Sequence, residues 1–151
     1  LSMMFSVVSD FERVGDHAEN IAEYTKIVDN DNVSFSPEAI AELKELAAQS
    51  LLTLETAVDT YEYYKFDNID LVGELEEKVD DLKDKAIEGH LERLMQTDCE
   101  PRAGVIFTDM AIDLERCSDH ATNVAFSLFG ESTLWDDKPE TIPEAVRDSI
   151  F

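Results

Sequence analysis

The sequence has little glycine, proline and cysteine, and each shortage excludes a class of protein. Five glycines and four prolines in 151 residues are too few for a loop-rich or all-β fold. The two cysteines, Cys99 and Cys117, are far apart and lack metal-ligand spacing, so neither a disulfide framework nor a secreted protein is indicated. No hydrophobic run approaches the length that a bilayer-spanning helix requires.

Basic residues are also scarce: 12 stand against 35 acidic residues, which gives a formal net charge of −23. Such a surface repels nucleic acid phosphates and anionic lipid headgroups, so we expect neither nucleic acid nor lipid as a direct partner. For the same reason the chain is a poor receptor for free phosphate. It should attract cations instead. An acidic surface that only keeps the chain soluble is the alternative.

Apolar residues at heptad spacing are abundant, and they predict an all-α fold with four long helices. The expected helices cover about residues 2–29, 36–64, 67–96 and 101–130. Asp67 is expected to cap the third, Pro101 to start the fourth and Gly130 to close it. Short connections predict an antiparallel bundle over residues 1–130. Residues 131–151 form a polar tail with at most a short helix over 144–150.

The apolar spacing also predicts which face of each helix is buried. The expected core residues are, helix by helix, Met4, Val7, Phe11, Val14, Ala18, Ile21 and Val28; Ile40, Leu43, Ala47, Leu51, Leu54, Val58 and Tyr61; Val72, Leu75, Val79, Leu82 and Ala86; and Phe107, Met110, Leu114, Cys117, Ala121, Val124 and Leu128. Since the chain begins inside a helical pattern, we expect it to be a piece of a longer protein.

The first and fourth helices are copies of each other. Residues 10–22 match residues 113–125 at a constant offset of 103, and eight of the thirteen positions are identical. Helix packing explains the shared apolar positions, but it does not explain why Glu, Arg, Asp, His and Asn recur together. The repeated polar residues therefore point to a function.

Three of the repeated polar residues lie four apart, so each set shares one helical face. The two oxygen-bearing stripes are Glu12, Asp16 and Asn20, and Glu115, Asp119 and Asn123. Carboxylates at this spacing repel each other unless a positive charge lies between them, and oxygen ligands suit hard metal ions. The stripes thus predict metal binding, although they point away from the apolar seam and a solvated face is the alternative.

His17 and His120 follow the two aspartates, rotated away from the carboxylate stripe. For these histidines we favour a packing or capping role over metal ligation. Arg13 and Arg116 are expected to form ion pairs within their own helices.

These residues carry a resemblance to a known family: residues 12–22 are similar to the signature helix of the PhoU family. The resemblance covers about residues 1–130. It implies two three-helix bundles with multinuclear iron or zinc clusters on their surface, and a role in regulating phosphate uptake. The last three helices would then form one complete bundle, and the first would be the last helix of a preceding bundle.

The resemblance also implies a partner motif on the third helix, which maps onto Glu76 and Asp80. Glu77 and Asp81 have the same spacing and remain an alternative. Ser118 stands where the first copy has Gly15, a change expected to narrow a close backbone approach.

A narrower resemblance rests on residues 90–94 and 99–104, which are similar to the C-terminal PhoU-like domain of bacterial sodium/phosphate cotransporters. It implies a cytoplasmic, non-catalytic, metal-binding regulatory domain, with the transporter portion of the same or an associated protein as partner. A free-standing PhoU-type regulator and a metal-free interaction module are the alternatives, and a homodimer is a further expectation. No nucleophile or phosphate-binding glycine loop indicates an enzyme.

Overall fold

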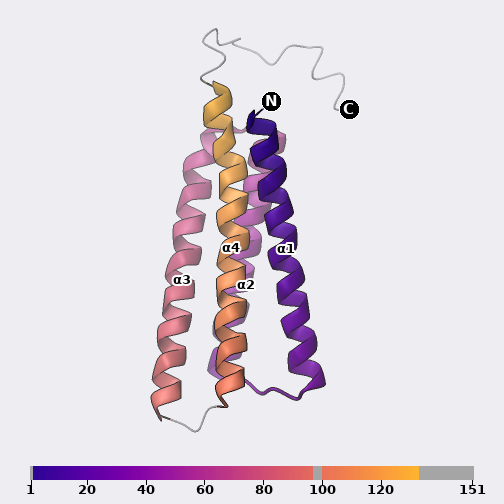
Figure 1. The fold of residues 1–151 in the computed structure, drawn as a ribbon. Coiled ribbons are helices and arrows are strands. Elements are labelled where there is room, and N and C mark those ends of the chain that lie inside the picture. Colours follow the sequence, from indigo (N-terminus) through magenta and orange to yellow (C-terminus); the bar gives the residue numbers. More distant parts are fainter. Residues whose placement is uncertain (1, 97–99, 133–151) are drawn as a thin grey trace.

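Four long helices account for most of the chain in the computed structural model, which describes residues 2–96 and 100–132 (Figure 1). The elements are α1 (Ser2–Asn30), α2 (Pro37–Glu62), the 3₁₀ turn η1 (Phe66–Asn68), α3 (Ile69–Gln96) and α4 (Pro101–Ser132). Consecutive helices run in opposite directions (Figure 1). The predicted all-α antiparallel bundle is confirmed, and the described residues contain no strand.

The ends of α2 follow from local backbone chemistry. Before its first residue, the Ser36 hydroxyl accepts a hydrogen bond from the Ala39 amide at 3.2 Å, and Pro37 takes the first helical position. The helix ends at Glu62 because Tyr64 adopts a left-handed conformation with φ 51°. The Lys65 amide then donates to the Thr60 carbonyl at 2.9 Å, which closes the last turn.

Two predicted boundaries are wrong. Asp67 lies inside η1, and α3 begins at Ile69, so Asp67 is not the residue before that helix. α4 continues beyond Gly130 to Ser132, because one glycine costs a helix only about 1 kcal/mol and does not by itself end it. The rest of the predicted tail, including the short helix over 144–150, lies outside the described residues.

α4 is the central helix: it packs against α1 on one side and against α2 and α3 on the other (Figure 1). The helices α2, α3 and α4 enclose a core that includes Leu46, Val79, Phe107 and Ala111. α1 packs mainly against α4. Among the described helices, none combines the length and apolarity that crossing a bilayer demands.

The predicted core faces of α3 and α4 are confirmed, whereas the face of α2 is partly wrong. Ile40 and Leu51 were expected in the core and are exposed, while Ser50 and Thr53 are buried. These hydroxyls tolerate burial because each donates to a backbone carbonyl: Ser50 to Leu114 at 2.6 Å, and Thr53 within its own helix.

The buried face of α1 also differs from the prediction at alternate positions. Val7 and Val14 lie toward α4 as expected, but the predicted core residues Phe11 and Ala18 are exposed. Met4 is exposed as well. The side chains that take their place face α4 at heptad spacing and are Asp10, His17 and Tyr24. Polar residues thus occupy a helix-helix contact that the apolar pattern assigned to hydrophobic ones.

Candidate functional site

The two copies of the repeat meet where α1 crosses α4. The Cys117 thiol lies 3.8 Å from the Val14 carbonyl, to which it donates, and these two residues are equivalent in the repeat. The equivalent rings of His17 and His120 stack with centroids 5.6 Å apart and planes 18° from parallel. Each repeated feature therefore contacts its own copy, which is the pattern of a local two-fold axis.

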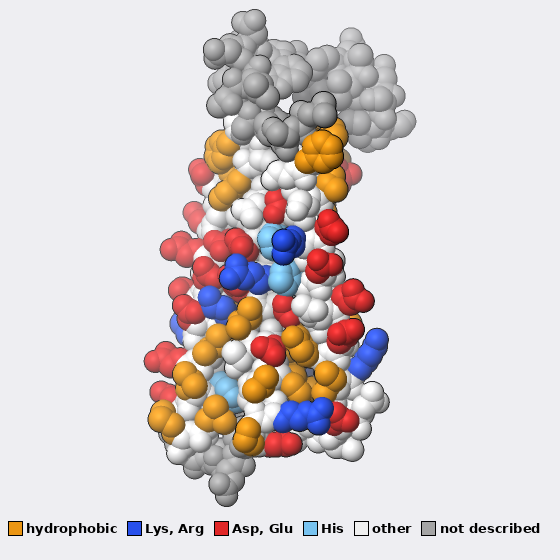
Figure 2. Space-filling model, in the orientation of Figure 1, with side chains coloured by type: hydrophobic (Ala, Val, Ile, Leu, Met, Phe, Trp, Pro, Cys, Tyr) orange, Lys and Arg blue, Asp and Glu red, His pale blue; other side chains and the backbone are white. Residues whose placement is uncertain are grey.

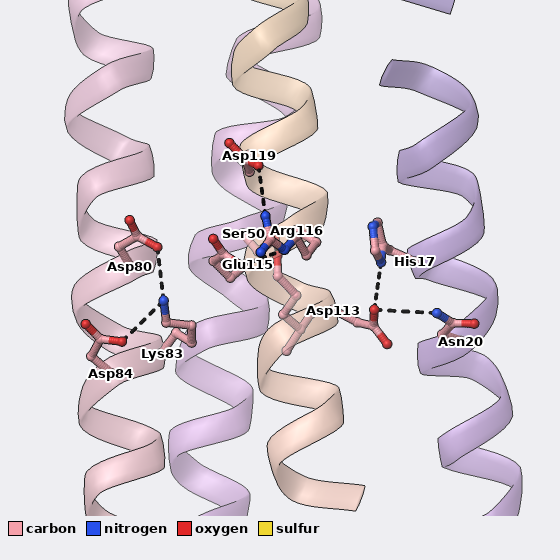
Figure 3. A network of polar contacts seen from close by, with 11 residues as sticks. His17, Asn20, Ser50, Asp80, Lys83, Asp84, Asp113, Glu115, Arg116 and Asp119 are labelled. Carbon is pink, nitrogen blue, oxygen red and sulfur yellow. Dashed lines mark hydrogen bonds and ion pairs between the residues drawn. The ribbon is translucent and has the colours of Figure 1, made fainter. Parts of the chain in front are cut away.

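Around this axis the first aspartate of each copy, Asp10 or Asp113, pairs with the histidine of the other copy. His17 Nδ1 lies 2.7 Å from Asp113 Oδ1, and the Asn20 amide donates to the same oxygen at 3.5 Å (Figure 3). In the equivalent pair, His120 Nδ1 lies 2.9 Å from Asp10 Oδ1. A carboxylate oxygen accepts, so in each pair the imidazole Nδ1 carries the proton that is donated.

The thiol beside this network is unsuited to nucleophilic chemistry. Burial raises the pKa of Cys117 to about 11, and the negative charge of Asp113 adds to the effect. At neutral pH the sulfur is therefore a protonated, buried group that packs as a small hydrophobe.

A second polar cluster lies between α3 and α4, where carboxylates of both helices face one another. Burial raises the pKa of Glu76, and the charges of Asp80, Asp119 and Glu115 raise it further. The pKa of Glu115 is raised as well: burial raises it most, the charges of Arg116 and Lys83 lower it in part, and Asp80 and Asp119 raise it. The structure thus brings together four of the sequence-predicted metal ligands.

Two basic side chains offset part of this negative charge (Figure 3). Lys83 Nζ lies 3.4 Å from Asp80 Oδ1 and 3.2 Å from Asp84 Oδ1. Burial would lower the pKa of Lys83, but the hydrogen bond to Asp84 and the nearby carboxylates raise it overall. On α4, Arg116 lies 3.5 Å from Asp119 and 3.6 Å from Glu115, so it forms ion pairs within its own helix as expected.

The remaining predicted ligands lie apart from this cluster. Glu12, Asp16 and Asn20 on α1 and Asn123 on α4 are exposed. On α3, Glu76 and Asp80 are half-buried toward α4, whereas the alternative pair, Glu77 and Asp81, is exposed.

The α3–α4 cluster has the donor chemistry of a site for hard cations, because every ligand is a carboxylate oxygen and positive charge is in deficit. Within residues 2–96 and 100–132, however, no three acidic, histidine or cysteine side chains are grouped closely enough to hold one metal ion. The residues fit a cation in charge and donor type. Their side chains would have to rotate toward each other to share one.

Comparison with known protein families finds a match that covers more than half of the chain. The family model described as the PhoU domain matches residues 43–128, which lie within the α2–α4 bundle. The chain belongs to the PhoU family.

Among curated proteins, the chain is similar to the phosphate-specific transport system accessory protein PhoU homolog 1 of Thermotoga maritima. The two are 28% identical over 119 residues, which is 77% of this chain and 49% of that protein. The chain therefore spans about half the length of this relative. No solved structure matches.

The second copy of the repeat has Ser118 where the first has Gly15, and the structure explains this difference. A side chain at Gly15 would meet open space, so the close backbone approach expected there is absent. Its equivalent, Ser118, is fully buried, and its hydroxyl has no partner among the described residues. The two positions differ because α4 is surrounded by three helices and α1 packs mainly on one.

Sequence reasoning missed the crosswise aspartate–histidine pairs, although a signal for them was present. Asp10, Val14, His17, Ile21 and Tyr24 follow the same three–four spacing as the apolar residues. In a repeat, an acid and a base on one seam can pair with each other's copies when the two helices pack antiparallel.

Proposed function

We propose that this chain is a non-catalytic regulatory module of phosphate uptake that acts through a cation-dependent α3–α4 face. Membership of the PhoU family supports a regulatory role, as does similarity to a protein named as an accessory of a phosphate-specific transport system. The finer proposal is a cytoplasmic domain that biases the state of a sodium/phosphate cotransporter, in the same or an associated protein. A free-standing PhoU-type regulator is the second candidate.

One observation carries the cation-dependent part of this proposal: Glu76 and Glu115 face each other's helices with raised pKa values, because burial and neighbouring carboxylates disfavour their charged forms. Glu76 and Glu115 are both costly to ionise where they lie. A divalent or trivalent ion such as iron or zinc would supply the missing positive charge, and Glu76, Asp80, Glu115 and Asp119 would hold it. Relieved of their repulsion, α3 and α4 would pack more firmly and present a different surface to a partner.

The first test is elemental analysis of chelator-free protein with a thermal-melt titration against iron and zinc. We compare the double variant Glu115→Gln, Asp119→Asn with Glu77→Gln, Asp81→Asn, which removes the same charge from exposed positions on α3. We expect bound metal and a rise in Tm for the natural protein and the exposed-pair variant only. Equal metal binding by both variants would refute the site.

The second test measures phosphate uptake by cells of the source organism from which the gene for this chain has been deleted. Loss of the chain should change uptake at high external phosphate, and the natural sequence should restore it. If the Glu115→Gln, Asp119→Asn variant restores uptake control equally well, the module regulates without metal. Unchanged uptake after deletion would contradict the regulatory proposal itself.

A further inference from the structure

The end of the bundle where α1 begins and α4 ends has no charged side chains on these two helices. Charged residues make up 31% of the sequence, yet residues 2–9 and 121–130 contain none. The Asp10–His120 and His17–Asp113 pairs fix the antiparallel register, so these two uncharged segments lie side by side. Figure 1 shows them at the same end of the molecule as the connection between α2 and α3.

Exposed aromatic side chains are concentrated at this end, on α1, on the α2–α3 connection and on α4. Figure 2 shows hydrophobic side chains, in orange, on both sides of the upper end of the bundle. We call this surface the aromatic end, and define it by Phe5, Tyr63, Tyr64, Phe66, Phe126 and Phe129. Apolar surface gathered in this way marks an interaction site, and aromatic residues are enriched at the centre of protein interfaces.

An acidic rim borders the aromatic end. Residues 55–74 run from the last turns of α2 to the first turns of α3, and they include six acidic residues but one basic residue, Lys65. Lys65 is paired with Asp59, so it offsets little of this charge. A Cβ at Gly73 on α3 would lie 3.5 Å from the Phe126 ring, so the apolar centre reaches the rim. An apolar centre with a polar rim is the usual organisation of a protein interface.

Charge decides among the possible occupants of this surface. A second copy would bring together two chains of net charge −23, and anionic lipid headgroups are repelled for the same reason. Residues 133–151 follow directly on α4, but they carry five acidic and two basic residues, so they do not complement the rim either. The complementary occupant is a basic segment with an apolar face.

We propose that the aromatic end docks a basic cytoplasmic segment of a membrane transport protein, an inference that rests on the proposed function. The cytoplasmic loops of membrane proteins carry an excess of lysine and arginine next to apolar spans. The apolar face of such a segment would pack on Phe5, Val8 and Phe126. Its basic side chains would lie against the rim carboxylates, which include Glu62 and Asp67.

The test measures binding of a synthetic amphipathic helix to the full chain by fluorescence anisotropy. The labelled probe has about 18 residues, or five turns, with leucines on one face and lysines on the other. One control peptide replaces the lysines by glutamate, and another replaces the leucines by serine. We expect saturable one-to-one binding of the first peptide only, weakened by added salt.

A matched pair of double variants tests the apolar centre. Phe5→Ser with Val8→Ser removes side chains that are 68% and 58% exposed at the aromatic end, and should weaken binding roughly tenfold or more. Met95→Ser with Val105→Ser removes side chains that are 81% and 60% exposed where α3 ends and α4 begins, and should leave binding unchanged.

A second matched pair tests the acidic rim. Glu62→Gln with Asp67→Asn should weaken binding about threefold and reduce its salt dependence. Glu88→Gln with Glu92→Gln makes the same change in net charge at exposed positions near the other end of α3, and should have no effect.

Four results would overturn the proposal. The first is equal weakening by variants at the two ends, and the second is binding of anionic phosphatidylglycerol vesicles that Phe5→Ser with Val8→Ser abolishes. The third is a dimer in sedimentation that the same variant dissociates. The fourth is a change in the emission of Trp135, the single tryptophan, in that variant without peptide, because residues 133–151 would then cover the surface.

The outcome can be separated from that of the proposed function. Absence of peptide binding overturns the docking surface alone and leaves the metal and uptake experiments unaffected. Unchanged phosphate uptake after deletion of the gene would remove the transport protein as the partner, even if the peptide binds.

Discussion

Glu115 has a half-buried side chain that faces carboxylates of α3, so its negative charge is unfavourable where it lies. Its pKa is raised in the folded state, so the folded protein holds this proton more tightly than the unfolded chain does. The free energy of unfolding therefore falls as the pH rises from the ordinary carboxyl pKa through the raised one. We expect Glu115→Gln to stabilise the metal-free protein by about 0.5 kcal/mol at neutral pH.

The same substitution should bring little gain near pH 4, where the natural carboxyl is largely protonated in both states. Urea unfolding at the two pH values measures the difference, and Glu77→Gln, at an exposed position, is the control. A gain of equal size at both pH values would show that the charge of Glu115 is not its source.

The crosswise pairs make a second prediction at this scale. Replacing His17 by Gln and Asp113 by Asn, singly and together, should reveal a coupling of about 1 kcal/mol in the free energy of unfolding, because their side chains bond directly at 2.7 Å. The combination of His17 with Asp10 is the control, since Asp10 pairs with His120 instead. Equal coupling in both cycles would contradict the pairing.

At the scale of the helix, the repeat provides a matched pair of alanines in different environments. Ala121 is fully buried in the three-helix bundle, and its equivalent on α1, Ala18, is exposed. We expect Ala121→Leu to lower the free energy of unfolding by about 1–3 kcal/mol through overpacking. Ala18→Leu should change it by less than about 0.5 kcal/mol. Chemical denaturation compares them, and similar losses would mean that Ala18 is also covered.

How far the helices could be predicted depends on what surrounds each one. Val79 and Phe107 were predicted correctly because α3 and α4 bury continuous apolar stripes. The α2 prediction failed at Ser50 and Thr53, because hydroxyls that bond to backbone carbonyls can replace apolar side chains in a close helix contact. Hydropathy cannot detect this, because the accepting carbonyl belongs either to the preceding turn of the same helix or to another helix.

For the whole molecule, the net charge of −23 predicts that salt stabilises the fold. Raising NaCl from about 0.01 M to about 1 M shortens the Debye length roughly tenfold and screens the repulsion among carboxylates. We expect Tm to rise by several degrees at neutral pH and much less near the isoelectric point, about 4.1. Calorimetry at both pH values checks this, and an equal rise at both would assign the effect to general salting-out.

The sequence alone determined the four helices, the copied polar motif and the acidic surface, because helical periodicity, repetition and charge are properties of the chain itself. Only the tertiary structure decided that Glu76 rather than Glu77 lies toward α4 and that Asp10 and Asp113 each pair with the other copy's histidine. It also brought His90 to Gly104. The physical reason is that heptad spacing defines a helix face, whereas the neighbour of that face is set when helices pack together.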